Sequence, residues 1–142
     1  MKKLVLTGAA GRLGSYLREP LSQMCDTLVS TDWTEGLGEL YPGETYVKAD
    51  LGDLGAMEAV LDGAEMVVHF GAIGDEAAWD KILHSNIMGA YNVWEAAARK
   101  EVRRVIYASS IHAVGMYPKT QRIDTEVPHR PDTYYGLAKC LA

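Results

Sequence analysis

The sequence is poor in cysteine and has no clustered metal ligands. Its 142 residues include only two cysteines, Cys25 and Cys140, which lie far apart and form no CxxC motif. A reduced intracellular protein is the simplest interpretation, with a disulfide as the less favoured alternative. The four histidines show no HxxxH or similar spacing, so the sequence predicts no metal site.

Long hydrophobic runs and basic clusters are also missing. The chain starts MKKLVLTGAA, like a signal peptide, but the apolar run breaks at Gly8 and Arg12, and no window is long enough to span a bilayer. The formal net charge is -5, and Lys and Arg are scattered, which excludes an electrostatic footprint for nucleic acid or an anionic membrane. We therefore expect a cytoplasmic protein whose partners are small metabolites.

Short apolar runs alternate with segments of helical periodicity along one domain. The expected strands are residues 2–8, 27–32, 44–51, 64–72 and 103–110. The expected helices are residues 12–24, 54–63 and 76–100, with a last one starting near residue 134 after a proline-containing loop over 111–133. This alternation predicts an α/β fold, a Rossmann-like doubly wound parallel sheet of strand order 3-2-1-4-5. Ligands should bind where the order reverses, between strands 1 and 4.

A glycine-rich turn follows the first expected strand. The segment TGAAGRLG places its three glycines where the helix begins, so the backbone can approach a pyrophosphate and the helix N-terminus can bind it. A turn that serves packing alone is the alternative. The cofactor-binding candidates in this turn are Gly8, Gly11, Arg12, Leu13 and Gly14.

An acidic residue, Asp32, ends the second expected strand. Such a carboxylate accepts hydrogen bonds from the adenosine ribose and repels a 2′-phosphate, which favours NAD over NADP. The next residue is Trp33 rather than an arginine that could bind this phosphate, and Arg12 is the only residue that keeps NADP as an alternative. Four further residues after strands 3 and 4 are expected to line the cofactor pocket: Asp50, Leu51, Gly71 and Ala72.

The end of the chain carries a candidate catalytic pair. Tyr135 lies four residues before Lys139, so on a helix the two share a face, whereas Tyr134 points elsewhere. A phenol has an ordinary pKa of about 10, and a neighbouring ammonium favours the phenolate. Ser110, at the end of strand 5, can supply a hydroxyl to the same substrate oxygen. The pattern predicts general base chemistry.

Four segments give the chain a family resemblance: TGAAGRLG, NIMGAYNVWEAA, YASSIHAVG and YYGLAK. With them the chain resembles the extended short-chain dehydrogenases/reductases, the family of NAD-dependent sugar epimerases, dehydratases and dehydrogenases. The resemblance implies that Tyr135 is the catalytic base and that Lys139 lowers its pKa and binds the nicotinamide ribose. It also implies that Ser110 orients the substrate and that Asn86 supports a proton relay; Asn86 as a capping or packing residue stays open.

Within that branch the chain is similar to the uronate dehydrogenases, which oxidise hexuronic acids to aldarolactones with NAD. The segments GAAGRLG, ILHSNIMGAYN, SSIHAVGMYPKTQR and RPDTYYGLAKC carry this likeness. It implies substrate contacts from Ser110, Ile111 and His112, although His112 can equally be read as a polar loop residue. Ile111 stands where that family usually has asparagine, and Gly74 where it can have serine. Both departures remove hydrogen-bonding groups and leave the sugar open.

The resemblance also bears on organisation. It implies a homodimer with the helices after strands 4 and 5 at the interface. Residues 1–142 would be an NAD-binding Rossmann domain that ends within the helix of Tyr135 and Lys139, with the remainder of a longer enzyme absent. Two other functions stay open: a nucleotide-sugar epimerase or dehydratase, and a non-catalytic NAD-binding module.

Overall fold

Five parallel strands form one sheet in the order β3-β2-β1-β4-β5. The computed structural model describes all 142 residues. The strands are β1 (Lys3–Thr7), β2 (Thr27–Asp32), β3 (Glu44–Lys48), β4 (Met66–His69) and β5 (Arg104–Tyr107). The predicted fold class and strand order are therefore confirmed.

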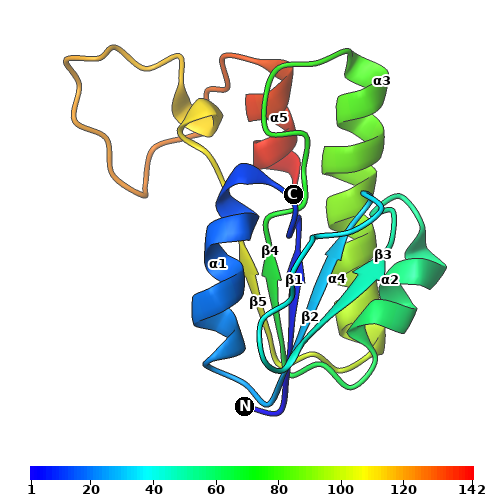
Figure 1. Cartoon of the computed structure of the whole chain (residues 1–142). Helices are drawn as coiled ribbons and strands as arrows, with labels where there is room; N and C mark the ends of the chain where they lie inside the picture. Colours follow the sequence, from blue (N-terminus) through cyan, green and yellow to red (C-terminus); the bar gives the residue numbers. More distant parts are fainter.

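Helices cover both faces of this sheet (Figure 1). They are α1 (Arg12–Ser22), α2 (Leu54–Leu61), α3 (Trp79–Ile82), α4 (Gly89–Arg99) and α5 (Tyr134–Leu141). Val5 of β1 packs in one core cluster with Met57 of α2 and Val93 of α4. Its neighbour Leu4 faces the other way, in a cluster against Leu17 of α1. Because successive strand residues point to opposite faces, a strand covered on both sides is apolar throughout.

The helical segment after β4 differs from its prediction. The sequence predicts one helix over residues 76–100, but the structure is helical only from Trp79, and a π-helix (Leu83–Met88) separates α3 from α4. The wider π-turn turns Asn86 inward, where it is buried against the loop after β4. The expected loop over 111–133 also contains a 3-10 helix (Ile111–Val114), which the Ser110 hydroxyl caps by accepting from the His112 N–H. Hydrophobic periodicity cannot distinguish these local variants of helix.

Neither cysteine forms a disulfide, since Cys25 and Cys140 are both free thiols. The structure contains no group of three or more His, Cys, Asp or Glu side chains that could hold a metal ion. None of its helices has both the length and the hydropathy to cross a membrane.

A buried ion pair fixes the segment that follows Asp32. Arg18 of α1 donates from Nε to Glu44 Oε1 at 2.8 Å and from Nη2 to Oε2 at 3.0 Å. The same guanidinium donates to the carbonyls of Leu37 at 3.2 Å and Glu39 at 2.7 Å. The fork geometry of arginine allows all these contacts at once. The irregular chain between β2 and β3 is thereby held against α1.

The surroundings of Glu44 keep it ionised. Burial raises the pKa of its carboxyl, but hydrogen bonds from Arg18, from the Ser30 hydroxyl at 2.5 Å and from the Tyr41 N–H at 2.9 Å outweigh burial, so the pKa lies below its ordinary value. The pKa of Glu44 is lower in the folded state than in the unfolded state, so its carboxylate stabilises the fold fully at pH values above the unfolded-state pKa. This stabilisation is lost as the pH falls through the folded-state pKa.

We predict that Glu44→Gln lowers the free energy of unfolding at pH 7 by about 3–5 kcal/mol, because the Arg18 cation stays buried without its counter-charge. The variant should also lose less stability than wild type between pH 5 and pH 3, around the ordinary glutamate pKa of about 4.3. Urea denaturation at each pH measures both effects. Glu35→Gln is the control, since Glu35 pairs with Lys48 while its side chain is 90% exposed. Equal losses in the two variants would contradict the role of the buried pair.

Candidate active site

A cavity of about 790 Å³ opens at the carboxyl ends of the central strands. It lies where the strand order reverses between β1 and β4, as predicted. Seven of the expected cofactor residues line it: Gly8, Gly11, Asp32, Asp50, Leu51, Gly71 and Ala72. Arg12 and Leu13 lie in the exposed first turn of α1, and Gly14 is buried beneath the glycine turn.

The glycine turn brings β1, α1 and β4 into direct backbone contact. Gly8 has a φ of 73°, and a Cβ atom there would lie 2.6 Å from the Gly71 nitrogen. A Cβ atom on Gly14 would lie 2.0 Å from the Gly8 oxygen. At Gly11 the helix α1 starts without a side-chain cap, so its first N–H groups remain available to an anion. The turn therefore has the geometry of a pyrophosphate cradle.

Asp32 is held in place at the edge of the cavity. Its Oδ2 accepts from the Ala10 N–H at 3.0 Å, and its Oδ1 accepts from the Trp33 N–H at 2.8 Å. These bonds fix the carboxylate beside the glycine turn. Carboxylate oxygens have further lone pairs, which ribose hydroxyls can use.

One polar atom in the cavity wall lacks a partner. The Thr31 side chain is 1% exposed, and its Oγ1 makes no hydrogen bond, although Thr31 lines the cavity. Buried polar atoms are rarely left unpaired in native proteins. The free hydroxyl, the uncapped helix start and the oriented Asp32 carboxylate together fit a dinucleotide.

A histidine that no sequence motif singled out also lines this cavity. His84, in the π-helix, lines the cavity, and its Nε2 lies 3.3 Å from Asp50 Oδ2. The Gly52 N–H bonds to the other Asp50 oxygen at 2.8 Å, and this bond is the main cause that lowers the pKa of Asp50. No sequence signal marks His84, because the residues that face the cavity depend on the π-turn.

Lys139 and Tyr135 lie together on α5. Lys139 is 6% exposed, and its Nζ donates to the Ala108 carbonyl at a distance of 2.7 Å. The same Nζ lies 5.7 Å from the centre of the Tyr135 ring. Burial lowers the pKa of Lys139 to about 8, so the ammonium still predominates at pH 7. Tyr134 is exposed instead and packs its ring on Trp79 at 5.4 Å.

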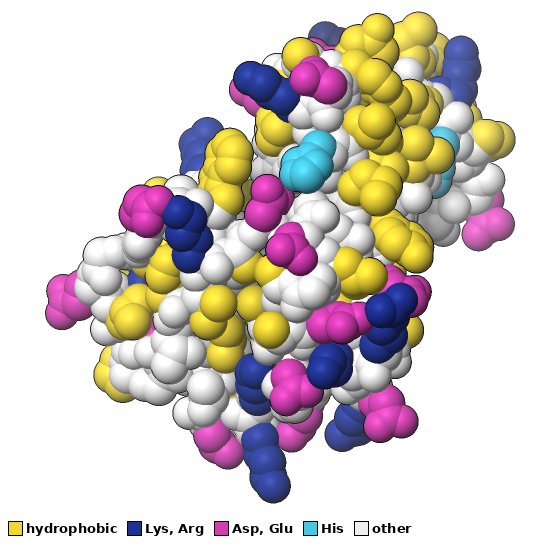
Figure 2. Space-filling view, turned by 90° about the vertical axis from the view of Figure 1, so that its right-hand side faces the viewer, with side chains coloured by type: hydrophobic (Ala, Val, Ile, Leu, Met, Phe, Trp, Pro, Cys, Tyr) yellow, Lys and Arg dark blue, Asp and Glu magenta, His cyan; other side chains and the backbone are white.

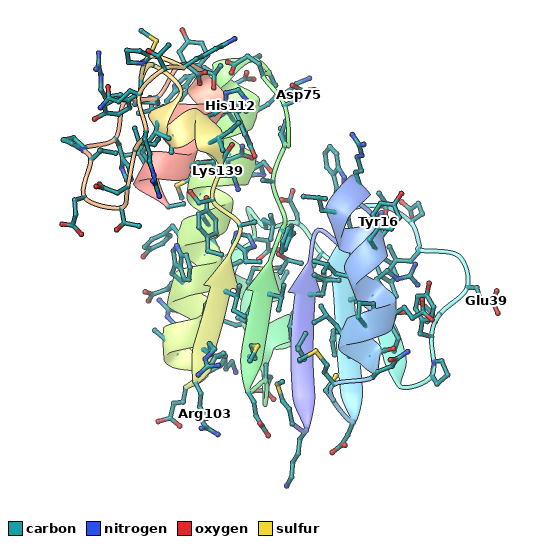
Figure 3. The ribbon with its side chains drawn as sticks, turned by 90° about the vertical axis from the view of Figure 1, so that its left-hand side faces the viewer. Tyr16, Glu39, Asp75, Arg103, His112 and Lys139 are labelled. Carbon is teal, nitrogen blue, oxygen red and sulfur yellow. The ribbon has the colours of Figure 1, made fainter.

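The rings of His112 and Tyr135 have their centres 5.9 Å apart. Figure 3 shows His112 at the same end of the molecule as Lys139. The His112 Nδ1 lies 2.9 Å from Asp132 Oδ1, and this contact lowers the pKa of Asp132. Ser110 caps the same turn and lies three residues beyond the end of β5 at Tyr107, so the strand is shorter than the predicted 103–110. Ile111 is 81% exposed, and a Cβ atom on Gly74 would meet nothing within 4 Å. The structure therefore brings Ser110, His112 and Tyr135 to one place and adds Asp132, which no sequence motif singled out.

Asn86 binds the loop after β4. Its side chain is buried, with Oδ1 accepting from the Ile73 N–H at 2.8 Å and Nδ2 donating to the Ile73 carbonyl at 3.0 Å. This contact corresponds to the packing role that the sequence left open. The proton relay stays a prediction.

A second histidine outside the predictions, His69, lies beneath Lys139. Its Nδ1 is 2.6 Å from the Thr7 hydroxyl, and its ring stacks on Tyr107 at 5.5 Å. Burial, together with the Lys139 charge, lowers the pKa of His69 to about 3. The imidazole is therefore neutral at physiological pH and adds no second charge beside Lys139.

Comparisons with known proteins agree with this geometry. The model of the NAD dependent epimerase/dehydratase family matches residues 4–142. Uronate dehydrogenase of Pseudomonas putida is 42% identical over 97% of this chain and 52% of its own length. L-arabinose 1-dehydrogenase (NAD(P)(+)) of Haloferax volcanii is 35% identical over 98% of this chain and 58% of its own.

The solved structures that match include a tyrosine-to-alanine mutant of uronate dehydrogenase from Agrobacterium tumefaciens, complexed with NAD. It is 42% identical, with a TM-score of 0.95 over 99% of this chain and 53% of that one. The chain thus spans about half the length of the curated relatives it matches.

Proposed function

The chain belongs to the NAD dependent epimerase/dehydratase family, and we propose that it forms the dinucleotide-binding part of an oxidoreductase that oxidises a sugar hydroxyl. The observation that carries this proposal is the buried Lys139 ammonium 5.7 Å from the Tyr135 ring, in a fold whose glycine turn opens a cavity. The proposed substrate is a hexuronic acid, oxidised to its aldarolactone. Relatives at 42% and 35% identity named as uronate and L-arabinose dehydrogenases support a free sugar over a nucleotide sugar.

The residues that would hold NAD are those of the cavity. The glycine turn and the first N–H groups of α1 would bind the pyrophosphate, and Asp32 would accept from the ribose hydroxyls. Asp50 and Leu51 would lie against the adenine, while Gly71 and Ala72 would leave room for the remainder of the dinucleotide. Bound NAD would supply the acceptor for the hydride that leaves the sugar carbon.

Tyr135 would take the proton of the sugar hydroxyl. The Lys139 ammonium favours the phenolate and can donate to the nicotinamide ribose. Ser110 and His112 would hold the substrate oxygen, and Asp132 would keep the His112 ring in one orientation through its 2.9 Å contact. The hydroxyl proton passes to Tyr135 as the C–H bond gives up its hydride, so that the C–O bond becomes the carbonyl of the lactone.

We propose that residues 1–142 form the NAD-binding domain of the full-length protein and that further segments of it complete the sugar pocket. The coverage of about half of the relatives' length supports this division.

We also propose a homodimer, formed through the helices that follow β4 and β5, with the α3–α4 face at its interface. Figure 2 shows hydrophobic side chains gathered along this side of the molecule. The exposed members on α3, the π-helix and α4 are Trp79, Leu83, Met88 and Tyr91, at 40%, 40%, 46% and 52% exposure. A contiguous apolar surface of this kind is typical of a protein interface.

Sedimentation should give twice the chain mass, and Tyr91→Glu should give monomers. A wild-type monomer at assay concentrations would refute the proposal.

We predict that Asp32→Ala weakens NAD binding by about tenfold or more, because a charged acceptor for the ribose is lost. NADP binding should improve at the same time, since repulsion of the 2′-phosphate disappears. Calorimetric titration of both cofactors measures the change. Asp124→Ala removes a carboxylate from the distant loop, where it binds only the Glu126 N–H, and is the matched control. Equal affinities of the wild type for NAD and NADP would refute the assignment.

We predict that Tyr135→Phe lowers kcat by about 10²–10⁴-fold with nearly unchanged NAD affinity, because the general base is lost while the cavity remains. Tyr134→Phe should leave both unchanged, since Tyr134 faces Trp79. The assay follows NADH absorbance with glucuronate, galacturonate, L-arabinose and a UDP-sugar. An epimerase or dehydratase returns the hydride to its substrate and accumulates no NADH. Conversion of the UDP-sugar without NADH accumulation, followed by chromatography of the sugar, would therefore favour that alternative. NAD binding without turnover of any sugar would favour a non-catalytic module.

A further inference from the structure

The loop between β4 and α3 touches both halves of the candidate site. Five of its residues line the cavity: Phe70, Gly71, Ala72, Ile73 and Ala77. The loop then runs upward beside α5 before α3 begins (Figure 1). A single segment therefore contacts the cofactor cavity and the helix that carries Tyr135 and Lys139.

Glu76 makes the contact with that helix. Its Oε1 accepts from the Tyr134 N–H and its Oε2 from the Tyr135 N–H, each at 3.2 Å. The first N–H groups of a helix have no partner within the helix, and a carboxylate there interacts favourably with the helix dipole. The Thr133 hydroxyl accepts from the Gly136 N–H at 2.8 Å. Glu76 and Thr133 together pair the first three N–H groups of α5.

Contacts on both sides of Glu76 hold the loop in place. Asn86 binds both backbone groups of Ile73, and Trp79, where α3 begins, packs on the Tyr134 ring at 5.4 Å. Glu76 lies between these two anchors. These two anchors hold the Glu76 carboxylate at the start of α5.

We propose that Glu76 is a positioning residue that couples the cofactor loop to the helix of Tyr135. With the loop ordered against the dinucleotide, both carboxylate oxygens fix the N–H groups at the start of α5. One of these N–H groups belongs to Tyr135 itself, so the phenol is set in place when the cofactor is bound. This role rests on the proposed function, but the coupling between loop and helix can be observed without catalysis.

The test combines hydrogen exchange with kinetics in the full-length protein. In wild type, NAD should slow amide exchange both in residues 71–77 and in residues 134–141. In Glu76→Ala, NAD should still slow exchange in the loop but no longer in the helix. The kcat for sugar oxidation should fall about tenfold, with the KM for NAD changed less than twofold, because a small misplacement of a catalytic group reduces the rate steeply.

Two further variants make the result specific. Glu76→Gln is nearly isosteric and has one acceptor oxygen instead of two, so it should show an intermediate loss while folding normally. Asp75→Ala removes the neighbouring carboxylate, which accepts only from the Glu76 N–H, and should behave like wild type. Exchange in residues 134–141 that still responds to NAD in Glu76→Ala would overturn the proposal, as would equal effects of Asp75→Ala. Intact exchange coupling in a wild-type protein that oxidises no sugar would refute the proposed function alone.

Discussion

The backbone contact between the glycine turn and the start of the loop after β4 is the constraint on which the site depends. Gly8 lies against Gly71 so closely that a Cβ atom cannot fit between them. This contact joins the ends of β1 and β4, from which the chain departs to opposite faces of the sheet. The crevice left between the departing segments is the cavity, and α1 begins at its wall. Any side chain at Gly8 would push these strand ends apart and deform the cavity.

A second constraint is electrostatic and concerns the buried ammonium of Lys139. Removing a cation from water is unfavourable, which is why its pKa falls to about 8. The Ala108 carbonyl and the face of the Tyr107 ring, 4.6 Å from Nζ, partly replace water. The neutral His69 beneath it adds no repulsion. The surroundings thus keep one charge near Tyr135, where a phenolate would need it.

Several features of the site could be read from local sequence because each depends on one short segment. The strands follow from short apolar runs, and Asp32 ends its strand in the structure as predicted. Helix α5 begins at Tyr134, as predicted. Other features escaped prediction because they join distant segments. Glu76 reaches the N–H groups of α5 across 58 and 59 residues, and Asp132 meets His112 across 20.

The sequence by itself determined the doubly wound sheet, the glycine turn and the family, since hydrophobic periodicity and local motifs act over a few residues. Only the tertiary structure decided which side chains surround these motifs. The π-turn places His84 at Asp50 and Asn86 at Ile73, and this shift in helical phase leaves no hydrophobic pattern to read. Hydrogen bonds between polar groups depend on positions that the packed sheet and helices set, so they became visible only once the chain was folded.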